Sequence, residues 1–144
     1  MIAIDTNVLL RYLLSDDDIQ TKKAIKVING NEKVLITDIV LAEAIWTLKG
    51  KKYKLDKEAI LTVLNALFAE PNICFEDQQT VWKAINDYAN AASVKVGSKR
   101  KTADFPDALI VNKARLISKI SGESLEGVYT FDVAAQKIPG TKIP

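Results

Sequence analysis

Short apolar runs alternate along this chain with longer segments whose apolar residues recur at helical spacing. The short runs predict strands at 2–5, 34–37, 73–75, 127–131 and 141–143. The longer segments predict helices at 7–14, 16–28, 38–49, 56–69, 77–92 and 104–121, and a helical turn at 133–137. Residues 93–103 carry no helical pattern, and we expect them to form a basic loop.

This alternation of strands and helices favours an α/β fold with a mainly parallel sheet covered on both faces. A length of 144 residues, 48% of them hydrophobic, favours one domain over residues 1–144. Ligands of such sheets bind beyond the carboxyl ends of the strands. Asp5 ends the first predicted strand and Asp132 follows the strand at 127–131, which makes both acids candidate site residues.

The composition excludes several classes of chemistry. The chain has no histidine, which excludes Ser-His-Asp and Cys-His catalysis and histidine-rich zinc sites. A single cysteine excludes an internal disulfide framework. No apolar run approaches the length of a membrane span, and the start does not resemble a signal peptide. We therefore expect a cytoplasmic protein whose catalysis rests on Asp, Glu, Lys, Ser, Thr or Tyr, or on a metal held by oxygens.

Five acidic residues are candidates, and each also has a purely structural interpretation. Asp5 fits a helix N-cap, and Asp104 and Asp107 flank Phe-Pro at a helix start where the helix dipole favours acids. Asp132 fits the start of a turn. Glu43 lies inside the helix at 38–49 and fits an exposed residue paired with a lysine.

Helical spacing favours a functional role for two of these acids, Glu43 and Asp107. Glu43 falls between two apolar faces of its helix, so we expect that helix to be largely covered. One face holds Val40, Leu41, Ala44, Ile45 and Leu48, and the other holds Ile39, Ala42 and Trp46. Asp107 heads an apolar stripe that we expect to face the core, with Asp104 on the same side. The stripe comprises Ile110, Val111, Ala114 and Ile117.

Several carboxylates held together would repel one another unless a cation relieved the repulsion. Mg²⁺ and Mn²⁺ prefer oxygen ligands, and a pair of such ions activates water in phosphodiester cleavage. In a chain without histidine, this chemistry requires the fewest assumptions.

Four motifs, in this order, resemble the PIN-domain family, and most closely the VapC-type toxin ribonucleases of toxin–antitoxin pairs. They are IDTNVLLRYLLSDD, LAEAIWTL, ADFPDALI and YTFDVAAQKIPG, and the resemblance covers essentially the whole chain. The family's acidic quartet carries over to Asp5, Glu43, Asp107 and Asp132. Thr6, Asn7 and Thr130 match polar positions of the family's pattern, which implies that they orient the carboxylates or a water. Asp104 is an additional acid nearby that we expect to support the site.

The resemblance also implies an architecture, an activity and partners. The architecture is a three-layer α/β/α sandwich around a four- or five-stranded, mainly parallel sheet. The activity is an Mg²⁺- or Mn²⁺-dependent endoribonuclease with an RNA substrate. The implied partners are a second copy in a homodimer and a cognate VapB-type antitoxin that blocks the acidic pocket.

Two questions stay open at this level. Basic residues before the third motif either guide RNA phosphates or are plain solvated surface; they are Lys95, Lys99, Arg100 and Lys101. The main alternative function is a binding or scaffold module that keeps the fold without the activity. A phosphatase of the haloacid dehalogenase type ranks low, because it requires an acid where this chain has Asn7.

Overall fold

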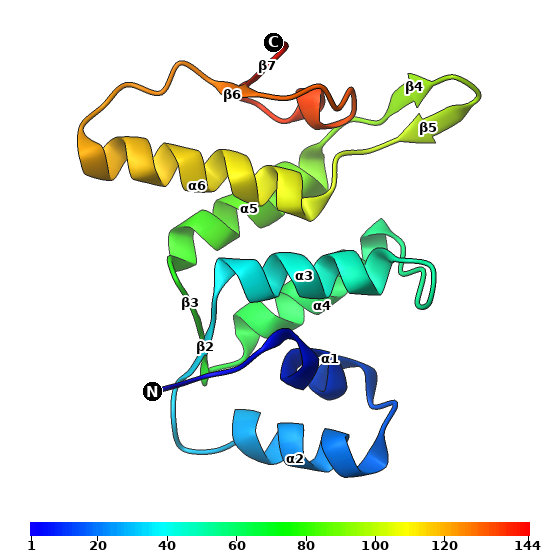
Figure 1. Cartoon of the computed structure of the whole chain (residues 1–144), viewed down its shortest axis with the longest axis vertical. Helices are drawn as coiled ribbons and strands as arrows, with labels where there is room; N and C mark the ends of the chain where they lie inside the picture. The colour runs from blue at the N-terminus through cyan, green and yellow to red at the C-terminus, as the bar shows by residue number, and fades with distance from the viewer. The chain divides into compact units, whose positions relative to one another are not determined.

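Three short apolar segments pair as a parallel sheet in the first half of the chain. The computed structural model describes all residues from Met1 to Pro144, and they fold as two compact units, Met1–Gln78 and Gln79–Pro144. In the first unit, the strand order is β1-β2-β3, with every pair parallel (Figure 1). The strands are β1 (Ile2–Ala3), β2 (Val34–Ile36) and β3 (Ile73–Phe75).

Four helices connect and cover these strands. They are α1 (Thr6–Leu14), α2 (Asp18–Ile28), α3 (Asp38–Lys49) and α4 (Lys57–Ala69). Each helix is preceded by an N-cap residue whose side chain accepts a hydrogen bond from a backbone N–H of the first turn. This bond satisfies one of the N–H groups that have no partner within the helix. These N-caps are Asp5, Asp17, Thr37 and Asp56.

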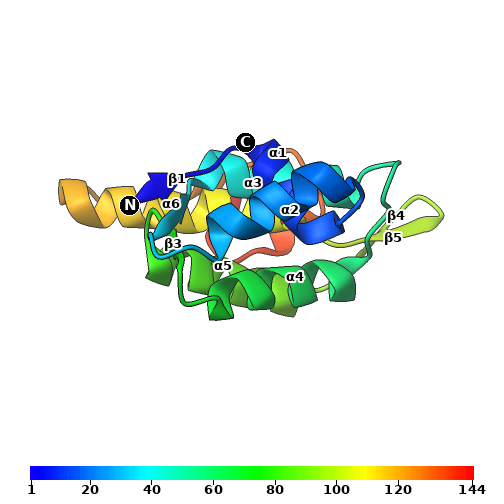
Figure 2. The ribbon, with the colours of Figure 1, turned by 90° about the horizontal axis from the view of Figure 1, so that it is seen from below.

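The buried side chains of the first unit come from all of these helices and from β2 and β3. Helix α1 packs against α2 and α3, and α4 packs against α3 and β3. Figure 2 shows α1 and α2 running side by side. Leucines and isoleucines that are almost fully buried fill the space between these elements, among them Leu9, Ile28, Ile36, Leu41 and Leu64.

The second unit contains two long helices, an antiparallel hairpin and a small parallel pair of strands. The helices are α5 (Gln78–Asn90), whose first residue belongs to the first unit, and α6 (Phe105–Ser121). The hairpin joins β4 (Val94–Val96) to β5 (Lys99–Lys101), and β6 (Val128–Tyr129) pairs with β7 (Thr141–Lys142). A short 3₁₀ turn, η1 (Ala135–Lys137), precedes β7.

The α/β fold class is confirmed, with six helices and a parallel sheet. The expected parallel strands are divided between the units, three in the first and two in the second. No helix combines the length and apolar character that crossing a bilayer requires.

The expected loop at 93–103 is wrong, because its central residues form the β4–β5 hairpin. Gly97 and Ser98 connect the strands, and Gly97 has a φ of 64°. A glycine with positive φ at the first position of a two-residue turn suits a type II′ hairpin. The Val-Lys-Val run before the turn supplies the alternation of the first strand.

Two predictions about covered helix faces are also wrong. On α3, Ile39 is 71% exposed and Trp46 is 57% exposed, so only one of the two apolar faces is covered. On α6, Ile110 and Ile117 are more than half exposed. The buried residues of α6 are instead Phe105, Pro106, Ala108, Leu109, Val111 and Asn112.

Candidate active site

Asp5 lies at the carboxyl end of β1 and caps α1. Its Oδ1 accepts a hydrogen bond of 2.9 Å from the backbone N–H of Val8. The side chain is exposed, and Oδ2 accepts no hydrogen bond from the protein. The N-cap interpretation is therefore right, and it leaves one carboxylate oxygen available to a ligand.

Glu43 is held beside the start of α1 by the residue that follows Asp5. The Thr6 hydroxyl donates to Glu43 Oε2 at 2.6 Å, which links two segments 37 residues apart. Glu43 is exposed, contrary to the expectation that its helix is largely covered. Its other oxygen, Oε1, accepts no hydrogen bond from the protein. Two acids singled out in the sequence are thus connected through Thr6, each with one uncommitted oxygen.

Sequence reasoning missed two further acids at the same edge of the sheet. Asp38 comes two residues after β2, and Glu76 follows β3 directly. Glu76 Oε2 accepts a hydrogen bond of 2.6 Å from the backbone N–H of Asp38 at the start of α3. A carboxylate is favourable at a helix N-terminus, because the helix dipole is positive there. Asp38 and Glu76 each follow a predicted parallel strand, as Asp5 does. The same signal that identified Asp5 could therefore have identified them.

In the second unit, Asp104 and Asp107 share the first turn of α6. Asp104 is the N-cap, and the two residues form a capping box. Asp107 Oδ2 accepts a hydrogen bond of 2.9 Å from the backbone N–H of Asp104. Both side chains are half-buried. Both acids therefore take part in capping the start of α6.

Asp132 is held in the turn that leads from β6 to η1. Its Oδ1 accepts from the backbone N–H of Ala135 at 2.9 Å, and its own N–H donates to the Thr130 hydroxyl at 3.0 Å. Asp132 is exposed, and its Oδ2 accepts no hydrogen bond from the protein. This acid is thus arranged like Asp5 and Glu43, with one oxygen positioned by the chain and the other uncommitted.

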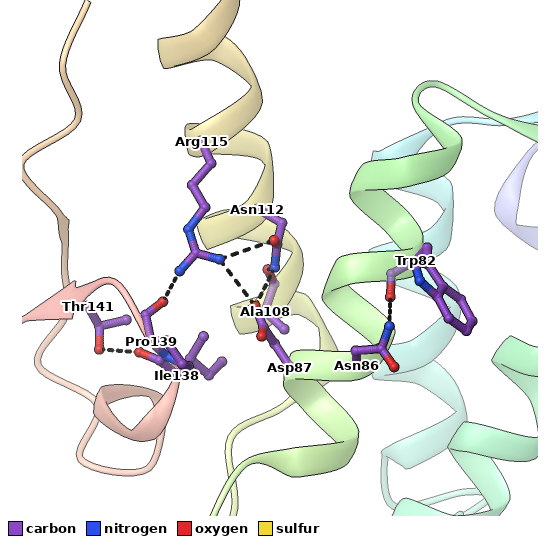
Figure 3. Close-up of polar contacts among 9 residues, drawn as sticks. All are labelled: Trp82, Asn86, Asp87, Ala108, Asn112, Arg115, Ile138, Pro139 and Thr141. Carbon is purple, nitrogen blue, oxygen red and sulfur yellow. Dashed lines mark hydrogen bonds and ion pairs between the residues drawn. The ribbon is translucent and has the colours of Figure 1, made fainter.

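A polar network that the sequence did not reveal ties α6 to α5 and to the C-terminal segment (Figure 3). Asn112 is only 3% exposed and donates to Asp87 on α5 at 2.8 Å and to the Ala108 carbonyl at 2.9 Å. Arg115 donates to Asp87 at 3.4 Å and also to the carbonyl of Pro139. A buried amide needs partners, so this network ties the helix whose first turn contains Asp107 to its neighbours.

The basic residues at 95–101 lie on the β4–β5 hairpin. Lys95 is directly opposite Arg100, and both are exposed, as are Lys99 and Lys101. Arg100 donates to the Ser93 hydroxyl, and no carboxylate pairs with any of the four cations. The sequence contains no acidic residue from 88 to 103. The hairpin is therefore a surface of uncompensated positive charge.

The donor chemistry of these acids fits a hard divalent cation. Mg²⁺ takes oxygen ligands and is commonly bound through one or two carboxylates together with water and substrate phosphates. Asp5, Glu43 and Asp132 each present an uncommitted carboxylate oxygen. The structure contains no group of three or more His, Cys, Asp or Glu side chains arranged around one point.

Comparison with known protein families matches residues 2–132 to the PIN domain family. The chain belongs to the PIN domain family. The match starts with β1 and ends at Asp132, so it includes all five acidic candidates. No individual curated protein matches the chain.

Family membership supports a nuclease-type, hydrolytic function for this PIN domain and a nucleic-acid substrate. PIN nucleases generally use divalent metals, which agrees with the oxygen-rich donors described above.

Proposed function

We propose that this PIN domain is a metal-dependent endoribonuclease and the toxin of a type II toxin–antitoxin pair. The observation that supports it most strongly is the hydrogen bond from Thr6 to Glu43. It connects two acids of the predicted quartet and leaves each of them an oxygen for a cation. In this proposal the two units form one domain over residues 1–144, and Asp107 and Asp132 complete the site.

The residues have separate roles in the proposed reaction. Asp5, Glu43, Asp107 and Asp132 would hold Mg²⁺ or Mn²⁺, and Asp104 supports Asp107 from the same helix turn. Thr6 and Thr130 position Glu43 and Asp132 through the hydrogen bonds described above. When bound, the metal supplies an activated water and stabilises the leaving oxygen of the phosphodiester. Asn7 lines the same pocket as Asp5 and would orient substrate or water.

The basic hairpin supports binding of a nucleic-acid phosphate backbone, which in this proposal is that of RNA. Lys95 and Arg100 lie directly opposite one another in the antiparallel hairpin. Like charges in such positions destabilise the pair of strands. A phosphate backbone would neutralise them and release its counterions. We therefore assign phosphate contacts to Lys95, Lys99, Arg100 and Lys101.

Two partners belong to the proposal. A homodimer is supported by the exposed isoleucines of α6, Ile110, Ile117 and Ile120, which are between 53% and 72% exposed. A VapB-type antitoxin would block the acidic site with a basic side chain, and both partners would act in the cytoplasm.

Cleavage of a labelled structured RNA tests the proposed function. We expect cutting with Mg²⁺ or Mn²⁺, none with EDTA, and none by Asp5→Asn purified in the same way. Glu58→Gln is the matched control, because Glu58 is an exposed acid on α4 outside the site. Equal cutting by wild type and Asp5→Asn would indicate a contaminating nuclease. Absence of cutting across a panel of cellular RNAs, with no metal binding, would favour the catalytically silent scaffold module.

A further inference from the structure

A pocket of about 280 Å³ lies within the first unit, between α1 and α2. Asp5 forms part of its wall, so the pocket opens beside a proposed metal ligand. Val8, Ala24 and Val27 provide an apolar lining. This volume is just below the roughly 300–1,000 Å³ that is typical of ligand pockets, and it suits one small unit of a substrate.

Arg11 orients the Gln20 carboxamide, which lines the pocket from α2. Arg11 Nε donates to Gln20 Oε1 at 2.9 Å, and Arg11 is itself held by Asp16 at 2.5 Å. A guanidinium only donates, so the Gln20 oxygen must face Arg11. The Gln20 Nε2 group makes no hydrogen bond within the protein, so its two N–H groups are free to donate to a ligand.

Two other polar side chains of the pocket have no partner in the protein. Lys23 lines the pocket from α2 and forms no ion pair, and the Asn7 carboxamide makes no hydrogen bond. The pocket thus combines an apolar wall, two carboxamides and an unpaired cation. A nucleotide offers the complementary groups: a flat base, hydrogen-bonding base edges and a phosphate.

We propose that this pocket binds one nucleotide of the RNA strand at a position next to the bond that is cut, and that Gln20 selects the base. This inference rests on the proposed function, because it uses Asp5 to place the cleavage site. The base packs on Val8 and Val27, Gln20 Nε2 donates to an acceptor on the base edge, and Lys23 pairs with the phosphate. A peptide is the less favoured occupant, because one bound there would leave Lys23 unpaired unless it carried an acid.

Binding of a fluorescent single-stranded RNA in EDTA tests the pocket without cleavage. Lys23→Ala is compared with Lys22→Ala, the neighbouring exposed lysine of α2 that does not line the pocket. We expect Lys23→Ala to weaken binding about fivefold or more and to reduce the salt dependence by about one phosphate contact, and Lys22→Ala to change binding less than about twofold. Equal effects of the two variants would overturn the proposal.

Base selection has its own readout. NMR spectra of the Gln20 and Asn7 side-chain amides are recorded during titration with the four nucleoside 5′-monophosphates. We expect the Gln20 amide to shift more with some bases than with others, and Gln20→Leu to change the preferred base at the cleavage site in a random RNA pool. Identical cleavage profiles for wild type and Gln20→Leu, or shifts from an acidic peptide but from no nucleotide, would overturn the proposal.

These tests separate the pocket from the nuclease proposal. Metal-dependent cleavage with equal effects of Lys22→Ala and Lys23→Ala would reject the pocket and retain the nuclease. RNA binding that depends on Lys23, in a chain that never cuts, would retain the pocket as a nucleotide site and reject the nuclease.

Discussion

The hydrogen bond from the Thr6 hydroxyl to Glu43 is the contact on which the proposed metal site depends in the first unit. The hydroxyl is the only group of the protein that bonds the Glu43 carboxylate. Residues that orient metal ligands typically change metal affinity or activity when they are removed, even though they do not touch the metal.

We expect Thr6→Val to lower the single-turnover cleavage rate by roughly 10- to 100-fold and to raise the Mn²⁺ concentration that gives half of the maximal rate. Thr6→Ser keeps the hydroxyl and should recover most of the rate. Thr62→Val is the matched control, because the Thr62 hydroxyl bonds only a backbone carbonyl of α4. A Thr6→Val enzyme with the metal dependence of wild type would contradict the positioning role.

Asp16 gives a prediction for pH dependence. The hydrogen bond and charge of Arg11 lower the pKa of this carboxyl below its ordinary value. Because the Asp16 pKa is lowered in the folded state, the ionised carboxyl stabilises the folded protein above the unfolded-state pKa of about 4. This contribution to stability is lost as the pH falls through the folded-state pKa. NMR titration should show Asp16 ionising below the ordinary aspartate value, and Arg11→Leu should raise its pKa. An Asp16 pKa that is unchanged by Arg11→Leu would contradict this account.

The sequence predicted the bounds of α3 and the start of α6 well, because both have residues that typically cap helices. The helix at 38–49 is found at those bounds, between the Thr37 N-cap and Gly50. The predicted start of α6 is likewise confirmed, since Asp104 and Pro106 are standard signals of a helix N-terminus.

Helix faces were predicted less well, because periodicity locates apolar stripes without showing what covers them. Helix α6 has apolar residues on more than one side, and the exposed side contains Ile110 and Ile117. Its buried side includes Asn112, whose partner Asp87 lies on another helix and cannot be read from the spacing. The hairpin was not predicted, because the basic composition of residues 93–103 favoured a loop. The Gly97-Ser98 turn between two short strands was the signal for a hairpin.

The β4–β5 hairpin gives a prediction that separates stability from binding. Lys95→Glu turns the repulsive Lys95–Arg100 pair into an attractive one and should raise the free energy of unfolding by roughly 0.2–1 kcal/mol in urea titrations. The same change should weaken RNA binding. Lys83→Glu on the exposed part of α5 is the charge-matched control and should leave RNA binding nearly unchanged. If Lys95→Glu left RNA affinity at the wild-type value, the hairpin would not be a phosphate contact.

At the scale of the whole molecule, the family match extends from residue 2 to residue 132 and so crosses both compact units. The acids divide between the units, with Asp5 and Glu43 in the first and Asp107 and Asp132 in the second. The sequence indicated these acids through ordered motifs, whereas the hydrogen bonds that position them became visible only in the structure. That the units form one domain stays a prediction.

The two tryptophans offer a direct test of that prediction, because Trp46 lies in the first unit and Trp82 in the second. In Trp46→Phe the remaining tryptophan reports on the second unit, and in Trp82→Phe it reports on the first unit. For each variant, we expect urea unfolding to give the same midpoint by tryptophan fluorescence and by circular dichroism. Separate fluorescence and circular dichroism midpoints in either variant would mean that the units unfold independently.

Binding of Mn²⁺ tests most directly whether acids from both units form one metal site. The ion is titrated into wild type, Asp5→Asn, Glu43→Gln, Asp107→Asn and Asp132→Asn, with Glu58→Gln as control, and circular dichroism verifies that each variant is folded. We expect each of the four substitutions to weaken Mn²⁺ binding by about tenfold or more, and Glu58→Gln to bind Mn²⁺ like wild type. Loss confined to the variants of one unit, or wild-type affinity in all four, would contradict it.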